Sequence, residues 1–181
     1  KSVHTFTGES VNEDVWQKIQ KAIEAADSAP GILNCVTRLT LTERGLGGRA
    51  FSGELGWIIG SMFVPKDPKK KNLYQIDLAY RMFKLSIEFY KIGLGSCFAS
   101  YSFDKEKALK KCKHLHTMEF DAPLAMCFGY ESNKGSIIAK MYGWLSHYPQ
   151  RLPIDQIIEN YKNSPRSMNE VVGNTADNTM H

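Results

Sequence analysis

The sequence predicts an α+β protein in which helices flank a central sheet. Apolar residues recur at helical spacing in long segments, and they alternate with polar residues or fill short runs in others. These segments do not alternate regularly as strand, helix and strand, which favours an α+β over an α/β arrangement. We expect helices at 11–27, 76–92, 104–114 and 152–161, and strands at 36–42, 57–64 and 122–130.

Capping signals support the boundaries of these elements. Ser10 and Glu13 have the spacing of a capping box at the start of the first helix. Gly93 is suited to the left-handed position after the second, and Asp104 to the N-cap of the third. Pro153 suits the first position of the fourth.

The segments between these elements have their own character. Residues 43–56 form a glycine-rich loop, and the lysine-rich residues 66–72 form a basic loop. The buried-looking helix 76–92 is apolar on more than one side. We expect one domain over 1–164, followed by a polar C-terminal tail at 165–181.

Composition narrows the class of protein. The chain has 181 residues, of which 43% are hydrophobic and 23% charged, which suits one soluble domain or subunit. No apolar run reaches the length of a membrane span, and the first ten residues lack a secretion signal, although a chain that begins with Lys can have been trimmed. The net charge of +4 favours anionic small molecules over nucleic acid. We expect a cytoplasmic protein with no membrane or nucleic-acid partner.

The side chains do not form an evident catalytic centre. Four cysteines stand far apart; they can form two disulfides, but reduced thiols fit better. Cys112, His114 and His116 lack a fourth ligand at metal-site spacing, so we expect no metal. The sequence also has no nucleophile elbow and no paired carboxylates. This pattern suits a protein in which a cofactor performs the chemistry.

Four separated stretches resemble the nitroreductase family of FMN oxidoreductases. They are KSVHTF at the start, SAPGILN after the first helix, GLGSCFASYSFD from Gly93 to Asp104, and QRLP near the end. The resemblance spans about 1–162 and is closest to the subgroup with two fused, nitroreductase-like halves, whose motif looks like GLGTCWLGGTFD. It implies a nitroreductase-like fold with a mostly antiparallel sheet, and FMN as the cofactor.

The resemblance assigns the flavin ring to the segment after the second helix. By position, the backbone N–H of Ser100 is the donor to flavin N5, with Phe98, Ala99 and Tyr101 beside it. Small residues there would let the backbone approach a flat ring. Read without the resemblance, the same residues are a helix C-cap followed by a strand.

The resemblance also assigns the flavin phosphate. The family's opening motif places Lys1, Ser2 and His4 there, with His4 replacing a stronger cation, and its first arginine would fall just before Lys1. Arg151, before Leu-Pro, matches a phosphate-binding arginine.

A further motif covers another wall of the flavin site and is changed in this chain. Pro30 and Asn34 are retained, but Gly31 and Ile32 replace small hydroxyl residues, and no Gln-Pro-Trp follows. This departure leaves open whether the site is complete.

The resemblance implies an FMN-dependent enzyme that takes hydride from NAD(P)H and reduces nitroaromatics, quinones or similar acceptors. The alternative is a non-catalytic relative that binds a flavin, another ligand or a protein. We expect a homodimer with helix 76–92 near its centre and the tail lying across the partner, because one α+β layer can cover only one side of that helix.

Overall fold

A computed structural model of the chain describes residues 3–47, 51–100, 102–112 and 120–133. The chain divides into two compact units, Lys1–Met141 and Tyr142–His181, and the described residues all lie in the first. Their elements, in chain order, are α1 (Glu13–Ser28), β1 (Thr37–Thr42), β2 (Gly56–Phe63), α2 (Pro68–Lys91), β3 (Gly95–Ala99), α3 (Lys105–Lys111) and β4 (Phe120–Gly129).

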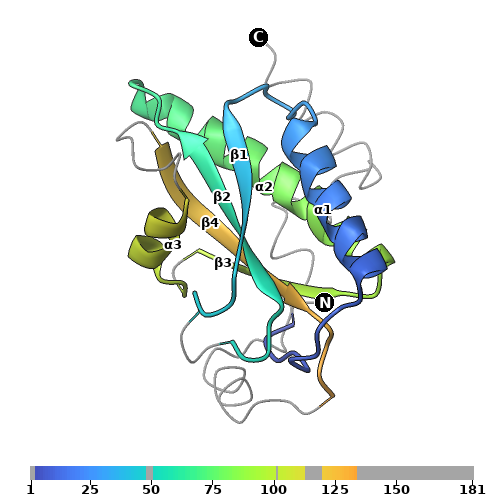
Figure 1. Cartoon of the computed structure of the whole chain (residues 1–181). Helices are drawn as coiled ribbons and strands as arrows, with labels where there is room; N and C mark the ends of the chain where they lie inside the picture. Colours follow the sequence, from blue (N-terminus) through green and yellow to red (C-terminus); the bar gives the residue numbers. More distant parts are fainter. Residues whose placement is uncertain (1–2, 48–50, 101, 113–119, 134–181) are drawn as a thin grey trace, which may run out of the picture. The chain divides into compact units, whose positions relative to one another are not determined.

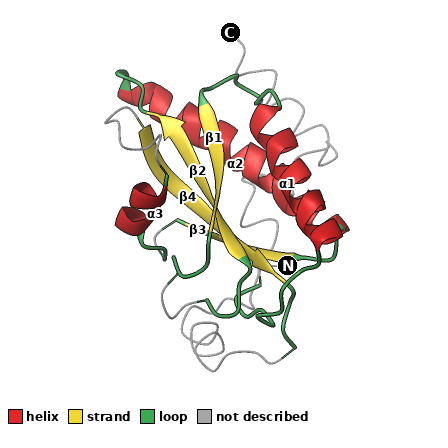
Figure 2. Cartoon of the chain, in the orientation of Figure 1, coloured by secondary structure: helices red, strands yellow, loops and turns green. Residues whose placement is uncertain are grey.

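The four described strands form one sheet in the order β1-β2-β4-β3 (Figure 2). All three pairings are antiparallel, which confirms the predicted fold class. β1 and β3 are the outer strands of this sheet, and β2 and β4 lie between them. The apolar runs predicted as central strands are therefore the two central strands, and β2 is buried over nearly its whole length.

The two faces of the sheet carry separate hydrophobic cores. α1 and α2 cover one face, and α3 lies on the other (Figure 1). Neighbouring residues of β2 divide between the faces, since Ile58 packs with the α1–α2 core and Ile59 with the α3 core. Both side chains are fully buried. This alternation is what a strand covered on both sides requires.

The caps of the helices agree only in part with prediction. The N-cap of α1 is Asn12, whose side chain accepts a hydrogen bond from Val15 N at 2.9 Å, so the predicted capping box of Ser10 and Glu13 is wrong. Asn12 is itself a strong capping residue and lies nearer the first apolar residue of the helix. The predicted cap of α3 is confirmed, because Asp104 accepts from Lys107 N at 2.9 Å.

α2 begins earlier than the apolar pattern indicates. It starts at Pro68, so most of the predicted basic loop is the first part of a helix. Proline is favoured at a first helical position, and the lysines after it are good helix formers that need no apolar partner. The helix is also less buried than expected: Leu78 and Phe89 are fully buried, whereas Phe83 is 56% exposed.

Some predictions fall outside the described residues. The helix at 152–161, the tail at 165–181, and His114 and His116 all lie there, so the domain boundary after 164 stays a prediction. Among the described helices, none combines the length and apolar character that crossing a membrane requires. Within the same residues, no three metal-ligating side chains form a cluster. All four cysteines are free thiols.

Candidate functional site

The glycine-rich motif after α2 first serves to end the helix. Gly93 has a φ of +83°, and Gly93 N donates to Tyr90 O at 3.0 Å. Leu94 N donates back to Phe89 O at 2.9 Å, which completes the usual glycine-terminated end of a helix. β3 follows at once, so the local interpretation, a C-cap followed by a strand, is confirmed.

Gly95 is small because the N-terminal segment packs against it. A Cβ at Gly95 would lie 2.7 Å from Val3 Cγ2. Val3 N also donates to Ser96 O at 3.1 Å, so the N-terminal segment runs beside the start of β3. The contact with Val3 therefore explains why position 95 is glycine. The candidates for a close approach to a flat ligand are then the residues after Ser96.

The outer edge of β3 offers backbone donors beyond that contact. Ser96 O accepts from Val3 N, so the backbone polar groups of Ser96 point away from β4. Every second residue of a strand has the same orientation, so the N–H of Phe98 also points away from β4. Neither Phe98 N nor Ser100 N has a backbone partner within the described part of the chain. The Phe98 side chain is 40% exposed, Ala99 is buried and Ser100 is exposed. Open amides beside small side chains fit the acceptor atoms of a flavin ring.

His4 lies beside the same strand but is poorly suited to bind phosphate. Its ring stacks on Phe51 at 5.4 Å between centroids, and its Nε2 lies 3.7 Å from Cys97 Sγ. Partial burial lowers the pKa of His4, which favours the neutral form at pH 7. Phe51 lies in the glycine-rich loop, and no sequence signal marked it as a neighbour of this site.

Pro30 and Asn34 lie at the opposite edge of the sheet. They precede β1, which is separated from β3 by two strands. Three spacings of about 4.8 Å put the two outer strands roughly 14 Å apart. The structure therefore brings His4 together with β3 within one chain, but it does not bring Pro30 or Asn34 to them.

The remaining predicted site residues are Lys1, Ser2, Tyr101 and Arg151, and all four lie outside the described residues. Trp57, in β2, is fully buried and donates its indole N–H to Glu54 at 3.1 Å. It is a core residue.

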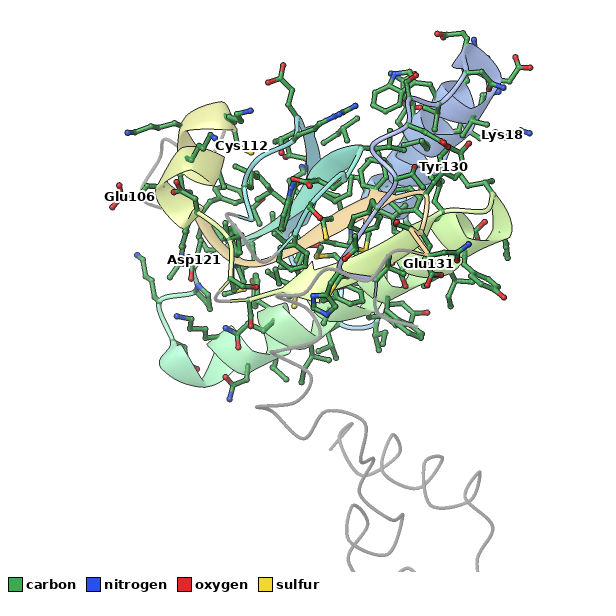
Figure 3. All side chains as sticks on the ribbon, turned by 90° about the horizontal axis from the view of Figure 1, so that it is seen from below. Lys18, Glu106, Cys112, Asp121, Tyr130 and Glu131 are labelled. Atoms are coloured by element: carbon green, nitrogen blue, oxygen red, sulfur yellow. The ribbon has the colours of Figure 1, made fainter. Side chains whose placement is uncertain are left out.

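Two grooves lie near these elements. One, of about 630 Å³, is lined by Val3, Gly95 and Ser96 on one side and by the exposed face of α2 on the other. Its far end includes Glu131, which follows β4 at the end opposite to Asp121 (Figure 3). Its described lining includes Gly93 to Ser96, at the start of the motif after α2, but not Phe98, Ala99 or Ser100.

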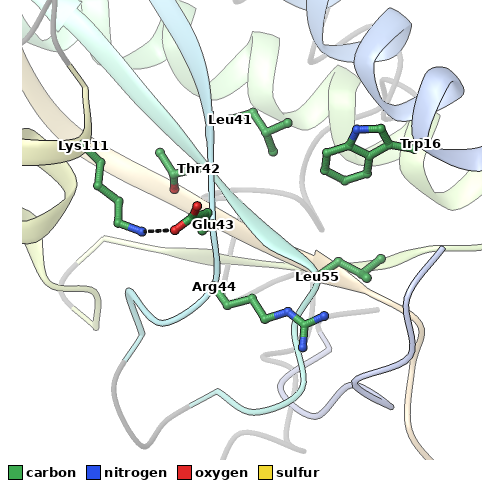
Figure 4. A pocket seen from close by; sticks show the side chains of 7 residues that line it. All are labelled: Trp16, Leu41, Thr42, Glu43, Arg44, Leu55 and Lys111. Atoms are coloured by element: carbon green, nitrogen blue, oxygen red, sulfur yellow. Dashed lines mark hydrogen bonds and ion pairs between the residues drawn. The ribbon is translucent and has the colours of Figure 1, made fainter. Parts of the chain in front are cut away.

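The second groove, of about 740 Å³, follows the β1 side, and no predicted site residue is among the described residues that line it. Figure 4 shows Trp16 and Leu55 at one end and the ion pair of Lys111 and Glu43, 3.1 Å long, at the other. Its described lining comes from α1, α3, β1 and the loop between β1 and β2, and not from β3.

Three of the four thiols, those of Cys35, Cys112 and Cys127, are not activated. Burial raises the pKa of Cys127, and the neighbouring Cys97 raises it further. Burial also raises the pKa of Cys35 and Cys112. Thiols with raised pKa values are protonated at neutral pH and are weak nucleophiles. These three cysteines therefore add no catalytic centre to the site.

Solved structures share this arrangement. A nitroreductase family protein from Clostridium difficile 630 matches with a TM-score of 0.63 and 16% identity, over 89% of this chain and 93% of that one. An oxidoreductase containing FMN matches with 0.65 and 12%, over 92% and 90%. A nitroreductase with bound FMN from Desulfitobacterium hafniense DCB-2 matches with 0.54 and 15%, over 74% and 86%. No curated protein matches the chain in sequence.

These likenesses and the antiparallel sheet with its flanking helices define an α+β protein with the nitroreductase fold. The chain belongs to the nitroreductase family described as "Putative TM nitroreductase", whose family model matches residues 1–176.

Proposed function

We propose that the chain is an FMN-dependent oxidoreductase of nitroreductase type, which takes hydride from NAD(P)H and reduces nitroaromatics, quinones or similar small acceptors. The observation that carries the proposal is the outer edge of β3, where open amides and small side chains follow the helix cap. The printed names of two similar structures, one containing FMN and one with bound FMN, support the choice of cofactor.

In this proposal the flavin ring lies along residues 98–101. Ser100 N–H donates to N5, and Phe98, Ala99 and Tyr101 lie beside the ring. When bound, the flavin supplies the redox chemistry by accepting a hydride and passing electrons on. The protein contributes the backbone donor, which favours electron density at N5, and an apolar surface from Phe98, which limits access of water.

The phosphate end of the cofactor lies near the N-terminus in this proposal. Lys1, Ser2 and Arg151 supply charge-assisted donors, as in the family motif. The packing of Val3 against Gly95 and Ser96 supports the placement, because it puts Val3 beside the start of β3, the strand that carries the proposed ring site. His4 takes part through its position rather than its charge, because burial lowers its pKa.

Two copies of the chain are needed to complete the site. Pro30 and Asn34 lie at the β1 edge and the ring segment at the β3 edge, so we propose that one subunit supplies the first pair to the flavin of the other. The resemblance to relatives with two fused halves also supports a homodimer, because a second copy of this chain would take the place of the second half. We assign the cofactor to a domain of residues 1–164, with the tail at 165–181 lying across the partner.

A stripe of exposed apolar residues on α2 supports the homodimer. Its members are spaced three, seven, four and three residues apart, and seven residues make about two helical turns, so all of them lie on one helix face. They are Leu73 (45% exposed), Ile76 (53%), Phe83 (56%), Ile87 (41%) and Tyr90 (80%). An apolar stripe of this regularity is typical of a helix that packs against another helix. We call these five residues the α2 stripe.

The second candidate function is a non-catalytic relative that binds a ligand or a protein. The neutral, packed state of His4 favours this candidate, because it removes one cation from the phosphate site. The exchange of small hydroxyl residues for Gly31 and Ile32 favours it as well. Both observations concern how tightly the cofactor is held, and neither removes the donors at β3.

The visible spectrum of the purified protein separates the two candidates. We expect the absorption bands of oxidised flavin, at one FMN per chain after reconstitution, and loss of the visible bands when NADH or NADPH is added without oxygen. A colourless protein that FMN cannot reconstitute would contradict the proposal. Bound FMN that neither nicotinamide reduces would support the non-catalytic candidate.

A further inference from the structure

A fully buried carboxylate on α2 reaches the loop that carries Pro30 and Asn34. Asp77 has no exposed surface, and it lies more than forty residues from that loop in the sequence. Its Oδ1 accepts a hydrogen bond from Leu33 N at 3.1 Å, and its Oδ2 accepts one from Cys35 N at 2.9 Å. One carboxylate therefore holds the backbone on both sides of Asn34.

The residue between these two amides has an unusual backbone. Asn34 has a φ of +52°, and it is the one non-glycine residue with positive φ among the described residues. Asparagine tolerates this region better than most residues, but the conformation still needs support from its surroundings. The two hydrogen bonds to Asp77 supply that support, and they fix the direction in which the Asn34 side chain leaves the loop.

The carboxylate also explains the residue at position 31. A Cβ on Gly31 would lie 2.0 Å from Asp77 Oδ2, so no larger residue fits there while Asp77 keeps its place. Gly31 stands where the family motif has a small hydroxyl residue. In this chain the Asp77 carboxylate occupies that space. Its hydrogen bonds to Leu33 N and Cys35 N hold the loop, although the loop lacks the hydroxyl side chain of the family motif.

Arg81, one helical turn after Asp77, holds the start of the same connection. Its Nη1 donates to Asp27 O at 2.9 Å, and Asp27 Oδ1 accepts from Leu39 N at 2.7 Å. Arg81 is only 8% exposed. One turn of α2 thus ties the end of α1, the loop and β1 together. The loop geometry therefore depends on side chains of α2 as well as on Gly31 and Asn34 of the loop itself.

We propose that Asp77 is a positioning residue for the cofactor, which holds Pro30 and Asn34 in the geometry in which they contact flavin. The inference rests on the proposed function, because it takes these two residues as flavin contacts. Residues 28–34, where the family motif is changed, are then held by a carboxylate from α2 in place of the missing hydroxyl side chains.

Amide hydrogen exchange in flavin-free protein tests the first half of this proposal. In Asp77→Asn, which keeps the shape but loses the charge and one acceptor, exchange at Leu33 and Cys35 should accelerate roughly tenfold to a hundredfold, the effect of losing hydrogen bonds to a charged acceptor. Amides of α1 should change little. Glu88→Gln, the same change at an exposed position of α2, is the matched control and should leave the loop amides unaltered. Unchanged exchange in Asp77→Asn would overturn the proposal.

FMN binding tests the second half. Asp77→Asn should weaken FMN at least tenfold, while Glu88→Gln should bind as the wild type does. Wild-type protein that binds FMN, together with unchanged affinity in Asp77→Asn, would overturn this inference alone. Wild-type protein that takes up no FMN would overturn the proposed function and this inference together, so the two failures are distinguishable.

A double-mutant cycle checks the contact directly. Gly31→Ala should accelerate exchange at Leu33 and Cys35, because its methyl group meets the carboxylate. In an Asp77→Ala background the same methyl group has room, so the added effect of Gly31→Ala should largely disappear. Equal effects of Gly31→Ala in both backgrounds would show that Asp77 does not occupy that space, and would contradict the proposal.

Discussion

Phe83→Ala, in the middle of the α2 stripe, is expected to weaken self-association of the chain. The side chain is 56% exposed, while its neighbours on the buried side of α2, such as Met82, are fully buried. The substitution therefore removes apolar surface that is not needed for the core of the single subunit. Its effect should fall on the assembly and not on folding.

The size of the effect follows from the area left to bury. Complete burial of a phenylalanine side chain stabilises by about 1.5–3 kcal/mol. Because Phe83 retains 56% of its exposure in one chain, about 1–1.5 kcal/mol remains for each copy. A two-fold interface contains both copies, which gives about 2–3 kcal/mol and a dissociation constant raised about thirtyfold to a hundredfold.

Sedimentation at a series of protein concentrations measures this change. The wild type should remain dimeric at concentrations where Phe83→Ala dissociates, and both should give the same far-UV circular dichroism. Val64→Ala is the matched control, because Val64 is an exposed apolar residue, at 37% exposure, that is not a member of the α2 stripe. Equal dissociation constants for wild type and Phe83→Ala would refute the placement of the interface. A wild-type monomer that binds FMN would refute the shared site.

Three further predictions concern the phosphate, the core and pH. Arg151→Ala should weaken FMN binding about tenfold to a hundredfold, as loss of a charge-assisted pair does, with little change in melting temperature. His4→Arg should tighten FMN binding. Equal FMN affinities of wild type and variants would contradict the phosphate assignment. Glu54→Ala should lower the free energy of unfolding by about 1–3 kcal/mol in a urea titration, since it leaves the buried Trp57 N–H without its acceptor, whereas the exposed Glu43→Ala should cost less than about 1 kcal/mol. Because the pKa of His4 is lowered in the folded chain, the unfolded chain binds a proton at His4 more readily. The free energy of unfolding should therefore fall as the pH drops below about 6.5. In urea titrations across pH, His4→Gln should reduce this pH dependence.

Local patterns were sufficient to predict most of the fold. The apolar runs at 57–64 and 122–130 became the two central strands, because a strand covered on both faces needs apolar residues throughout. The start of α2 was missed because its first turns are solvated lysines, which carry no apolar period. The short strand β3 was recognised only as a strand-like segment after the helix.

In the candidate site, the sequence could predict only those residue roles that depend on contacts between neighbours in the sequence. Gly93 ends a helix, and its role is visible from the preceding apolar pattern. Gly95 owes its size to Val3, and Gly31 to Asp77, and both contacts arise only when distant segments are brought together. Burial lowers the pKa of His4, and that burial arises only in the folded chain, so the residue type alone indicated more charge than the fold allows.

Amide resonances of residues 98–100, recorded while FMN is added to flavin-free protein, test the central claim most directly. In the proposed site the flavin ring lies along the outer edge of β3, with Ser100 N–H as donor to N5. The Ser100 amide should therefore shift most, Phe98 and Ala99 should shift with it, and the changes should saturate at one FMN per chain. Saturable FMN binding that leaves these three amides unshifted, or a folded protein that shows no binding at all, would contradict it.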